Sequence, residues 1–337
     1  MAVVEAPPQT PVPKKVAKAT DTRKQGALAA KLLTPTMAVL LLVIGYPILA
    51  AIYQSLFTQG QSVDADGFVV QGSQFVGLDS YAAIFSGDVG ARFWNAFYNT
   101  TFFTVVCVVI EVILGVAMAL IMNKAFKGKG LIRASILVPW AIPTVVSAKL
   151  WQWIFDANGI ANSMLGQQIL WATDGPQAKL AVIIADTWKT APFIALLVLA
   201  GLQVIPAEVY EAAKIDGANA WRQFWSMTLP LVKPALLVAV LFRLLDNLRM
   251  FDLPFVLIGA QKPSVETISI LAYLENQNSR YGPAAAYAFV LFLYVVVVSY
   301  AFVKLLGADV IGDNRAKTPT AGGRRRGLRT VAKGATP

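Results

Sequence analysis

Residues 97–122 read FYNTTFFTVVCVVIEVILGVAMALIM and carry a single charged side chain, that of Glu111. A helix needs about 20 consecutive, mainly apolar residues to cross a hydrocarbon core of about 30 Å, and this stretch is longer. A transmembrane β-strand would show weak alternation over about 10 residues, whereas this run is continuously apolar. The stretch therefore predicts a membrane-spanning helix and an all-α integral membrane fold.

Five further apolar runs extend this prediction along the chain. A mean hydropathy of +0.58 and a charged fraction of 14% are both typical of membrane proteins rather than soluble domains. We predict six transmembrane helices, at about residues 32–57, 97–122, 131–155, 179–204, 235–259 and 283–306. The remaining segments are a disordered basic arm at 1–31, an exported loop at 58–94, an amphipathic loop at 205–234 and a basic tail at 307–337.

The distribution of charge predicts the orientation of these spans. The loop at 58–94 holds four Asp residues and one Arg, whereas the loop at 123–133 and both ends of the chain are basic. Because cytoplasmic loops carry an excess of Lys and Arg, we expect both termini and the 205–234 loop in the cytoplasm. An even number of spans agrees with this orientation.

Composition excludes several classes of function. The chain has no His and a single Cys, Cys107, within an apolar run, so no metal site based on His and no disulfide framework is predicted. The net charge of +10 comes from basic residues beside the apolar runs, without interleaved aromatics. We therefore predict membrane lipids as partners and no nucleic-acid partner.

The most informative polar segment is residues 206–230, which read PAEVYEAAKIDGANAWRQFWSMTLP. Pro206 suits a first helical turn, and Glu208 complements the positive end of a helix dipole. Gly217, after Asp216, permits a left-handed break. A second helix then presents bulky side chains at helical spacing, and we expect Pro230 and Pro234 to end it. The pattern predicts a helical hairpin.

This hairpin has two interpretations. It either inserts into a groove on a cytoplasmic partner and transmits motion, or it lies on the membrane surface, which requires apolar residues but no particular spacing. The spacing resembles the EAA coupling loop of ABC importer permeases, through Glu211, Ala212, Ala213, Asp216, Gly217, Ala218, Phe224, Leu229 and Pro230. The resemblance implies the type I permease fold and docking of these positions onto ATPase subunits.

Further stretches resemble the sugar-importing, maltose- and trehalose-type branch of that family, over about residues 30–306. They are FVGLDSY at 75–81, NTT at 99–101, ADTWKTAP at 185–192 and LFRLLD at 241–246. The branch implies the import of a disaccharide such as trehalose across the bacterial cytoplasmic membrane. It also implies a second homologous permease, two copies of a P-loop ATPase and an extracytoplasmic solute-binding lipoprotein. The chain lacks the Gly-x-x-x-x-Gly-Lys-Ser/Thr stretch of a P-loop, so we expect ATP and Mg to bind to the partner ATPases. This chain is expected to be neither an enzyme nor the carrier of a cofactor.

Charged residues inside the predicted spans are candidates for a translocation path or gate. Each costs about 2.5–3.5 kcal/mol at mid-membrane, so they should face protein or a water-filled path. They are Glu111, Asp186, Lys189, Arg243, Asp246, Arg249 and Asp252. The last four alternate in sign at three-residue intervals, which would place neighbours on one helical face where they pair. Each residue either lines the path or belongs to a structural ion-pair network.

Two other functions compete with an importer. An ion-coupled secondary transporter would use membrane carboxylates such as Glu111 and Asp246, but such proteins usually show internal repeats, and it leaves the hairpin unexplained. A membrane enzyme would need a nucleophile, metal or carboxylate constellation, for which the sequence offers no cluster.

Overall fold

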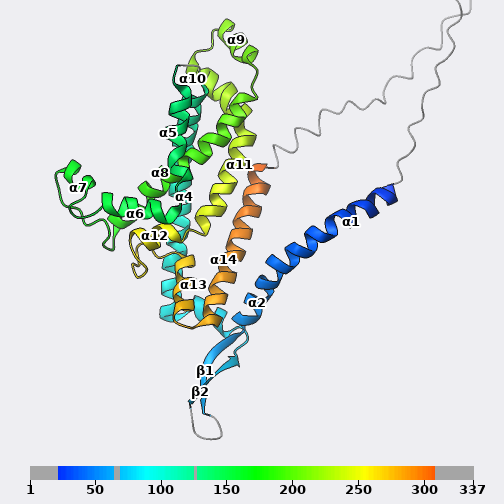
Figure 1. Cartoon of the computed structure of the whole chain (residues 1–337), viewed down its shortest axis with the longest axis vertical. Helices are drawn as coiled ribbons and strands as arrows, with labels where there is room; N and C mark the ends of the chain where they lie inside the picture. Colours follow the sequence, from blue (N-terminus) through cyan, green and yellow to red (C-terminus); the bar gives the residue numbers. More distant parts are fainter. Residues whose placement is uncertain (1–21, 64–68, 125–126, 308–337) are drawn as a thin grey trace, which may run out of the picture. The chain divides into compact units, whose positions relative to one another are not determined.

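The computed structural model describes residues 22–63, 69–124 and 127–307 (Figure 1). Two compact units make up the chain, residues 1–53 and 54–337. The first contains helix α1 (Thr22–Leu40), a π-helical turn (Leu41–Gly45) and most of α2 (Tyr46–Ser55). Residues 22–31, which we predicted as disordered, are therefore helical. Residues 1–21 of the predicted arm and 308–337 of the predicted tail lie outside the described residues.

The second unit is mainly helical with one small sheet. Its elements in chain order are β1 (Phe57–Val63), β2 (Val69–Phe75), α3 (Asp79–Phe85), α4 (Gly87–Asn123), α5 (Lys129–Ala141), α6 (Thr144–Ile154), α7 (Ile160–Leu165), α8 (Pro176–Gln203), α9 (Ala207–Ile215), α10 (Ala220–Gln223), a π-helical turn (Phe224–Thr228), α11 (Leu229–Leu248), α12 (Asp252–Leu257), α13 (Ile268–Gln277), α14 (Tyr281–Phe302) and a π-helical turn (Val303–Gly307).

Helices that are long and apolar enough to cross a membrane account for the predicted spans. Within the described residues, five qualify by themselves, and α5 with α6 forms one further, bent pair. The five are Leu28–Ser55, Gly87–Asn123, Pro176–Gln203, Ala220–Leu248 and Tyr281–Leu306. The prediction of an all-α protein that crosses the membrane several times is confirmed.

The third predicted span is not a continuous helix. α5 and α6 meet at an angle of 98°, at a break formed by Ile142 and Pro143. Proline has no backbone N–H and disfavours helical geometry in the residue before it. Ile142 accordingly adopts extended backbone angles, with φ −77° and ψ 134°. The predicted span at 131–155 therefore consists of two helices that meet at a sharp bend.

The fifth predicted span is displaced toward the N-terminus. Pro230 and Pro234 lie inside α11 and do not end the preceding helix, which contradicts the expectation above. The π-helical turn explains the continuity: the N–H of Leu229 bonds to the carbonyl of Phe224, five residues earlier, immediately before the first proline. α11 ends at Leu248, so the predicted end at residue 259 is wrong, and α12 is a separate short helix.

The predicted exported loop is more structured than expected. β1 and β2 form an antiparallel hairpin in the register Phe57 to Phe75, and α4 already begins at Gly87. α4 has 37 residues, which corresponds to about 55 Å at about 1.5 Å per residue. It is therefore longer than a hydrocarbon core of about 30 Å requires. In Figure 1 the β-hairpin and α9 lie at opposite ends of this unit.

Small residues allow α4, α8 and α11 to pack closely. A Cβ atom added to Gly115 of α4 would lie 2.7 Å from the Cβ of Ile194 of α8, and one added to Gly201 would lie 2.8 Å from the Cβ of Ala235 of α11. Ile194 is fully buried in a cluster that includes Ala119 and Val232. Such close backbone approach is typical of helix packing in membranes, where van der Waals contact replaces the hydrophobic driving force.

Candidate functional site

The predicted helical hairpin is present at residues 207–228. Gly217 has φ +75°, in the left-handed region that favours glycine. The N–H of Ala218 bonds to the carbonyl of Ala213 at 2.9 Å, and the N–H of Gly217 bonds to that of Lys214 at 3.1 Å. This pair of bonds is a Schellman motif, which satisfies carbonyls at the end of α9. The predicted break at Gly217 is confirmed.

The second arm of the hairpin begins at a capped residue. The side chain of Asn219 accepts a hydrogen bond of 2.9 Å from the N–H of Arg222, so one donor at the start of α10 is satisfied. Gln223 donates from its amide to the carbonyl of Ala218 at 2.7 Å, which ties this arm back to the turn. The hairpin therefore has a fixed shape set by its own residues.

The surface of the hairpin is largely uncovered. Of the nine residues predicted to dock onto an ATPase, five are exposed, three are partly buried and Ala213 is fully buried in the packing of α9. The exposed residues are Glu211, Ala212, Asp216, Gly217 and Pro230. Large apolar side chains accompany them: Ile215 is 86% exposed and Trp221 is 71% exposed. The rings of Trp221 and Trp225 pack edge to face at 5.6 Å.

A buried ion pair joins α4 to α11. Arg243 donates from Nε to Oε2 of Glu111 at 2.7 Å and from Nη2 to Oε1 at 2.9 Å. Arg243 is 3% exposed and Glu111 is 0% exposed. Thr190 of α8 donates a third bond to Glu111, at 2.7 Å. Because a charge buried without a partner is strongly unfavourable, this pair holds three helices in one arrangement.

Arg243 also contacts two aspartates. Its Nη1 lies 2.6 Å from Oδ2 of Asp246, and its Nη2 lies 3.2 Å from Oδ2 of Asp186. Nη2 further donates to Oδ1 of Asn247 at 2.8 Å. One guanidinium therefore interacts with three carboxylates, and its fork of donors fixes their relative positions.

A cleft of about 290 Å³ opens beside this cluster. Five of the seven charges predicted for a translocation path line it, whereas Glu111 and Arg243 do not. The lining residues are Thr144, Asp186, Lys189, Thr190, Asp246, Asn247, Arg249, Met250, Phe251, Asp252 and Leu253. Both helix breaks contribute to the cleft, because Thr144 follows the α5–α6 break and residues 249–251 separate α11 from α12.

The alternating charges of residues 243–252 pair in part. Arg243 bonds to Asp246, and Arg249 lies 3.7 Å from Asp246. No ion pair joins Arg249 to Asp252 among the residues that the structure describes. The reason is that α11 ends at Leu248, so Asp252 begins a new helix and does not continue the face that the spacing indicated.

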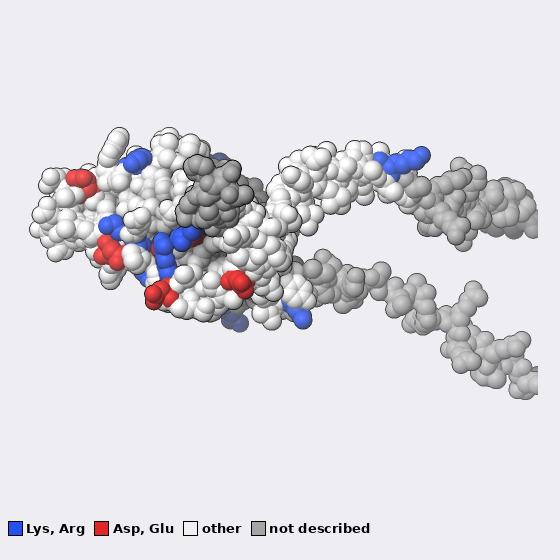
Figure 2. Space-filling model, turned by 90° about the horizontal axis from the view of Figure 1, so that it is seen from below, with Lys and Arg blue, Asp and Glu red and all other residues white. Residues whose placement is uncertain are grey.

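Two donors in the cleft have no partner within the described part of the chain. Lys189 is 9% exposed and makes no hydrogen bond or ion pair there. The amide nitrogen of Asn247 is buried and likewise unpaired. Lys189 lines the cleft, so its ammonium suits oxygen atoms of water or of a solute, whereas the Asn247 nitrogen is enclosed by the protein. The space-filling view in Figure 2 shows acidic and basic side chains gathered on a face that is otherwise largely uncharged.

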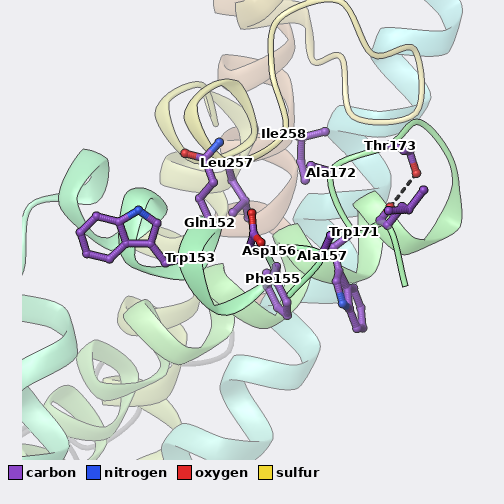
Figure 3. A pocket seen from close by; sticks show the side chains of 11 residues that line it. Gln152, Trp153, Phe155, Asp156, Ala157, Trp171, Ala172, Thr173, Leu257 and Ile258 are labelled. Carbon is purple, nitrogen blue, oxygen red and sulfur yellow. Dashed lines mark hydrogen bonds between the residues drawn. The ribbon is translucent and has the colours of Figure 1, made fainter. Parts of the chain in front are cut away.

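A second cavity, of about 410 Å³, lies where α6 and α12 end (Figure 3). It is lined by Gln152, Trp153, Phe155, Asp156, Ala157, Leu170, Trp171, Ala172, Thr173, Leu257 and Ile258. In Figure 3 the Trp153 ring points away from the other lining side chains. Trp171 is held in place because its indole N–H donates to Oδ1 of Asn162 at 2.9 Å.

Residues 174 and 175, which follow the cavity-lining residue Thr173, form hydrogen bonds with Ser264 in the loop between α12 and α13. Asp174 accepts a hydrogen bond of 2.8 Å from the N–H of Ser264, and the hydroxyl of Ser264 accepts one of 3.0 Å from the N–H of Gly175. The hydrogen bonds from Ser264 hold the pKa of the Asp174 carboxyl below its usual value. These links, and the pair of Arg92 with Glu266, were not predicted from the sequence.

Comparison with known proteins identifies related chains. A family model described as the binding-protein-dependent transport system inner membrane component matches residues 111–311. The chain is 37% identical to the trehalose/maltose transport system permease protein MalF of Thermococcus litoralis, over 84% of this chain and 94% of that protein. It is 36% identical to the trehalose transport system permease protein SugA of Mycobacterium tuberculosis, over 85% of this chain and 90% of that protein.

Solved structures agree on the fold. A bacterial ABC transporter involved in import of the acidic polysaccharide alginate matches with a TM-score of 0.70 at 22% identity, over 86% of this chain and 97% of that chain. A bacterial alginate ABC transporter in complex with an alginate pentasaccharide-bound periplasmic protein matches with a TM-score of 0.71 at 21% identity, over 84% and 95% of the two chains. The range matched by the family model includes both the hairpin and the cleft.

Proposed function

Because the chain belongs to the family of inner membrane components of binding-protein-dependent transport systems, we propose that it is the permease subunit of an ATP-driven importer of carbohydrates. Its fold is that of type I ABC importer permeases, and members of this family are non-catalytic translocation subunits. A disaccharide such as trehalose is the proposed substrate, since two relatives at 36–37% identity are named for trehalose.

The observation that carries this proposal is the exposed, internally fixed hairpin at one end of the second unit. A rigid helical hairpin with uncovered apolar side chains can fit a groove on a partner and transmit rigid-body motion. Ile215 and Trp221 are among the most exposed apolar residues of the described chain, and Glu211 and Asp216 of the same hairpin are exposed as well. The proposed partners at this surface are two copies of a P-loop ATPase that carry ATP and Mg.

The charged cleft is the proposed wall of the translocation path. Sugar hydroxyl groups both donate and accept hydrogen bonds, and the cleft offers both kinds of partner. Lys189 supplies a donor that has no partner among the described residues, and Asp246 and Asp252 supply exposed acceptors. Arg243 and Glu111 lie behind this wall, so we assign them to the network that fixes it.

The path requires other chains to be complete. We propose that a second, homologous permease supplies the opposite wall, and that an extracytoplasmic solute-binding lipoprotein delivers the sugar from the side of the β-hairpin. In this arrangement the hairpin at 207–228 and both termini face the cytoplasm of a bacterial cell. Two observations support it: the positive-inside pattern of the loops, and the likeness of this fold to an alginate transporter that was solved together with a periplasmic protein.

An ion-coupled secondary transporter is less well supported. It would use membrane carboxylates that bind and release a cation or a proton, and the sequence suggested Glu111 and Asp246. Both carboxylates bond to Arg243 at 2.7 Å or less, and Glu111 receives a further bond from Thr190. These contacts suit a fixed ion-pair network better than a coupling site that must exchange ions.

Purification of the tagged chain in mild detergent tests the proposal. We expect an ATPase with a P-loop and a second permease to co-purify, and the reconstituted complex to take up trehalose only with ATP and the solute-binding protein. Glu211→Lys should remove the ATPase from the complex, whereas Glu208→Lys, at an exposed residue outside the predicted docking set, should retain it. A lone chain that moves sugar without ATP would contradict the proposal.

A further inference from the structure

One face of the first half of α4 fastens residues 263–268 to the bundle. Arg92, Asn95, Asn99 and Thr100 recur at helical spacing, and each bonds to this segment. Asn95 and Asn99 both donate to the carbonyl of Pro263 at 2.7 Å. The N–H of residue 268 bonds to the hydroxyl of Thr100 at 3.1 Å. These bonds hold the segment against α4.

A nearly buried carboxylate strengthens this attachment. Glu266 is 3% exposed and accepts two bonds from Arg92, from Nε at 2.9 Å and from Nη2 at 2.6 Å. Asn99 also donates to the backbone carbonyl of Glu266 at 3.0 Å. A bidentate Arg–carboxylate pair is directional as well as strong, so it fixes the register of the segment on α4.

Thr267, the next residue, connects this fastened segment to the cleft. Its hydroxyl donates to the backbone carbonyl of Met250 at 2.8 Å and accepts from the N–H of Ile270 at 3.3 Å. Thr267 is fully buried, so water cannot replace either bond. Met250 lines the cleft together with its neighbours Arg249 and Phe251.

Residues 249–251 connect α11 to α12. The N–H groups of Arg249 and Met250 bond back to the last turn of α11, and the Phe251 ring packs against other aromatic rings. The carbonyl of Met250 lies beyond the last residue of α11 and accepts its hydrogen bond from the Thr267 hydroxyl. A change in this bond would therefore alter the direction of the backbone that carries two cleft-lining side chains.

We propose that Thr267 is a positioning residue that sets the geometry of the cleft wall at residues 249–251, with α4 as its fixed support. The proposal rests on the cleft being the sugar path. Through this connection, the loop between α12 and α13 determines which solutes fit the cleft without touching them.

The test compares Thr267→Val, which keeps the shape but removes the hydroxyl, with Thr267→Ser, which keeps the hydroxyl. Both are combined with Phe251→Cys in the assembled importer in proteoliposomes, and the labelling rate of this cysteine by a maleimide is measured. The single native cysteine, Cys107, is fully buried and gives little background. Thr101→Val is the matched control, because its hydroxyl bonds to Phe97 and Tyr294 and not to the fastened segment.

We expect Thr267→Val to change the labelling rate by about two- to tenfold, the population change that the loss of one hydrogen bond produces. Thr267→Ser and Thr101→Val should label like the parent. Should Thr267→Val fail to assemble, Glu266→Gln weakens the same attachment and is expected to change labelling in the same direction. An unchanged labelling rate in assembled Thr267→Val, or in Glu266→Gln where that variant replaces it, would overturn the positioning role.

The second readout is the ratio of trehalose to maltose uptake at saturating ATP. Thr267→Val should change this ratio, whereas Thr267→Ser should keep the ratio of the parent. A changed labelling rate with an unchanged ratio would overturn the link to solute choice. If the parent importer transports neither sugar, the proposed function fails, and labelling still decides whether Thr267 positions the wall.

Discussion

The Nε atom of Arg243 on α11 lies 2.7 Å from Oε2 of Glu111 on α4, across a sequence separation of 132 residues. Both side chains are almost completely buried, and Thr190 of α8 donates to the same carboxylate. Charges in such a position are costly unless paired, so the pair makes one arrangement of three helices much more favourable than others.

Loss of the cation of this pair alone should destabilise the protein more than loss of both partners. We expect Arg243→Met to lower the stability by about 3–5 kcal/mol, because it leaves the buried Glu111 carboxylate without a cation. Glu111→Gln should cost less, because Asp186 and Asp246 still pair with Arg243. The double variant should recover a large part of this loss. Thermal unfolding of the purified complex measures the effect, and a double variant as unstable as the sum of the single ones would contradict it.

Substitution at the hairpin turn should uncouple transport. Gly217→Val places a β-branched residue at φ +75°, where the left-handed conformation costs about 1–2 kcal/mol for an L-residue. We expect the chain to insert in the membrane but to retain less ATPase on purification and to lose ATP-dependent uptake. Gly166→Val is the control, since Gly166 has φ +65° at the end of α7, outside the hairpin. Equal ATPase retention in both variants would refute the docking role.

Removal of the unpaired cation in the cleft should reduce uptake while the complex stays intact. Lys189→Met is expected to lower the sugar uptake rate about tenfold, the effect of losing a hydrogen bond from a charged donor. Lys149→Met is the matched control, because Lys149 is an exposed lysine on α6 that bonds to Gln152 and does not line the cleft. Uptake and ATPase co-purification are measured together, and normal uptake by Lys189→Met would exclude Lys189 from the path.

Close packing of α4 on α8 makes a single methyl group costly. Gly115→Ala would bring the new Cβ to 2.7 Å from Ile194, so we expect a loss of about 1–3 kcal/mol from overpacking. Ile194→Ala in the same chain should restore part of this loss. Gly130→Ala on α5, where no atom lies within 4 Å, should leave the melting temperature unchanged or raise it slightly. Equal melting temperatures for the two alanine variants would show that the helices can separate.

The sequence alone determined the features that depend on local composition. Long apolar runs have no alternative to a membrane span, because the backbone polar groups of a helix are satisfied within the segment itself. The hairpin turn could also be predicted from the sequence, because Gly217 after Asp216 is a local signal for a left-handed residue. The structure has this residue at φ +75°. The predicted list of charges inside the spans also contained every acid that pairs with Arg243.

The tertiary structure decided how those charges are arranged and where two spans break. The sequence left each charge open between a path and a structural network, and their positions depend on which helices meet: Glu111 pairs with Arg243 in the buried interior, whereas Lys189 lines the cleft. Pro143 breaks a helix, whereas Pro230, which follows a π-helical turn, and Pro234 lie within a continuous helix. The bond of Arg92 to Glu266 spans 174 residues of sequence, and that of Thr267 to Met250 joins two different loops. No local pattern encodes such contacts, because only the packing of the helices brings their atoms together.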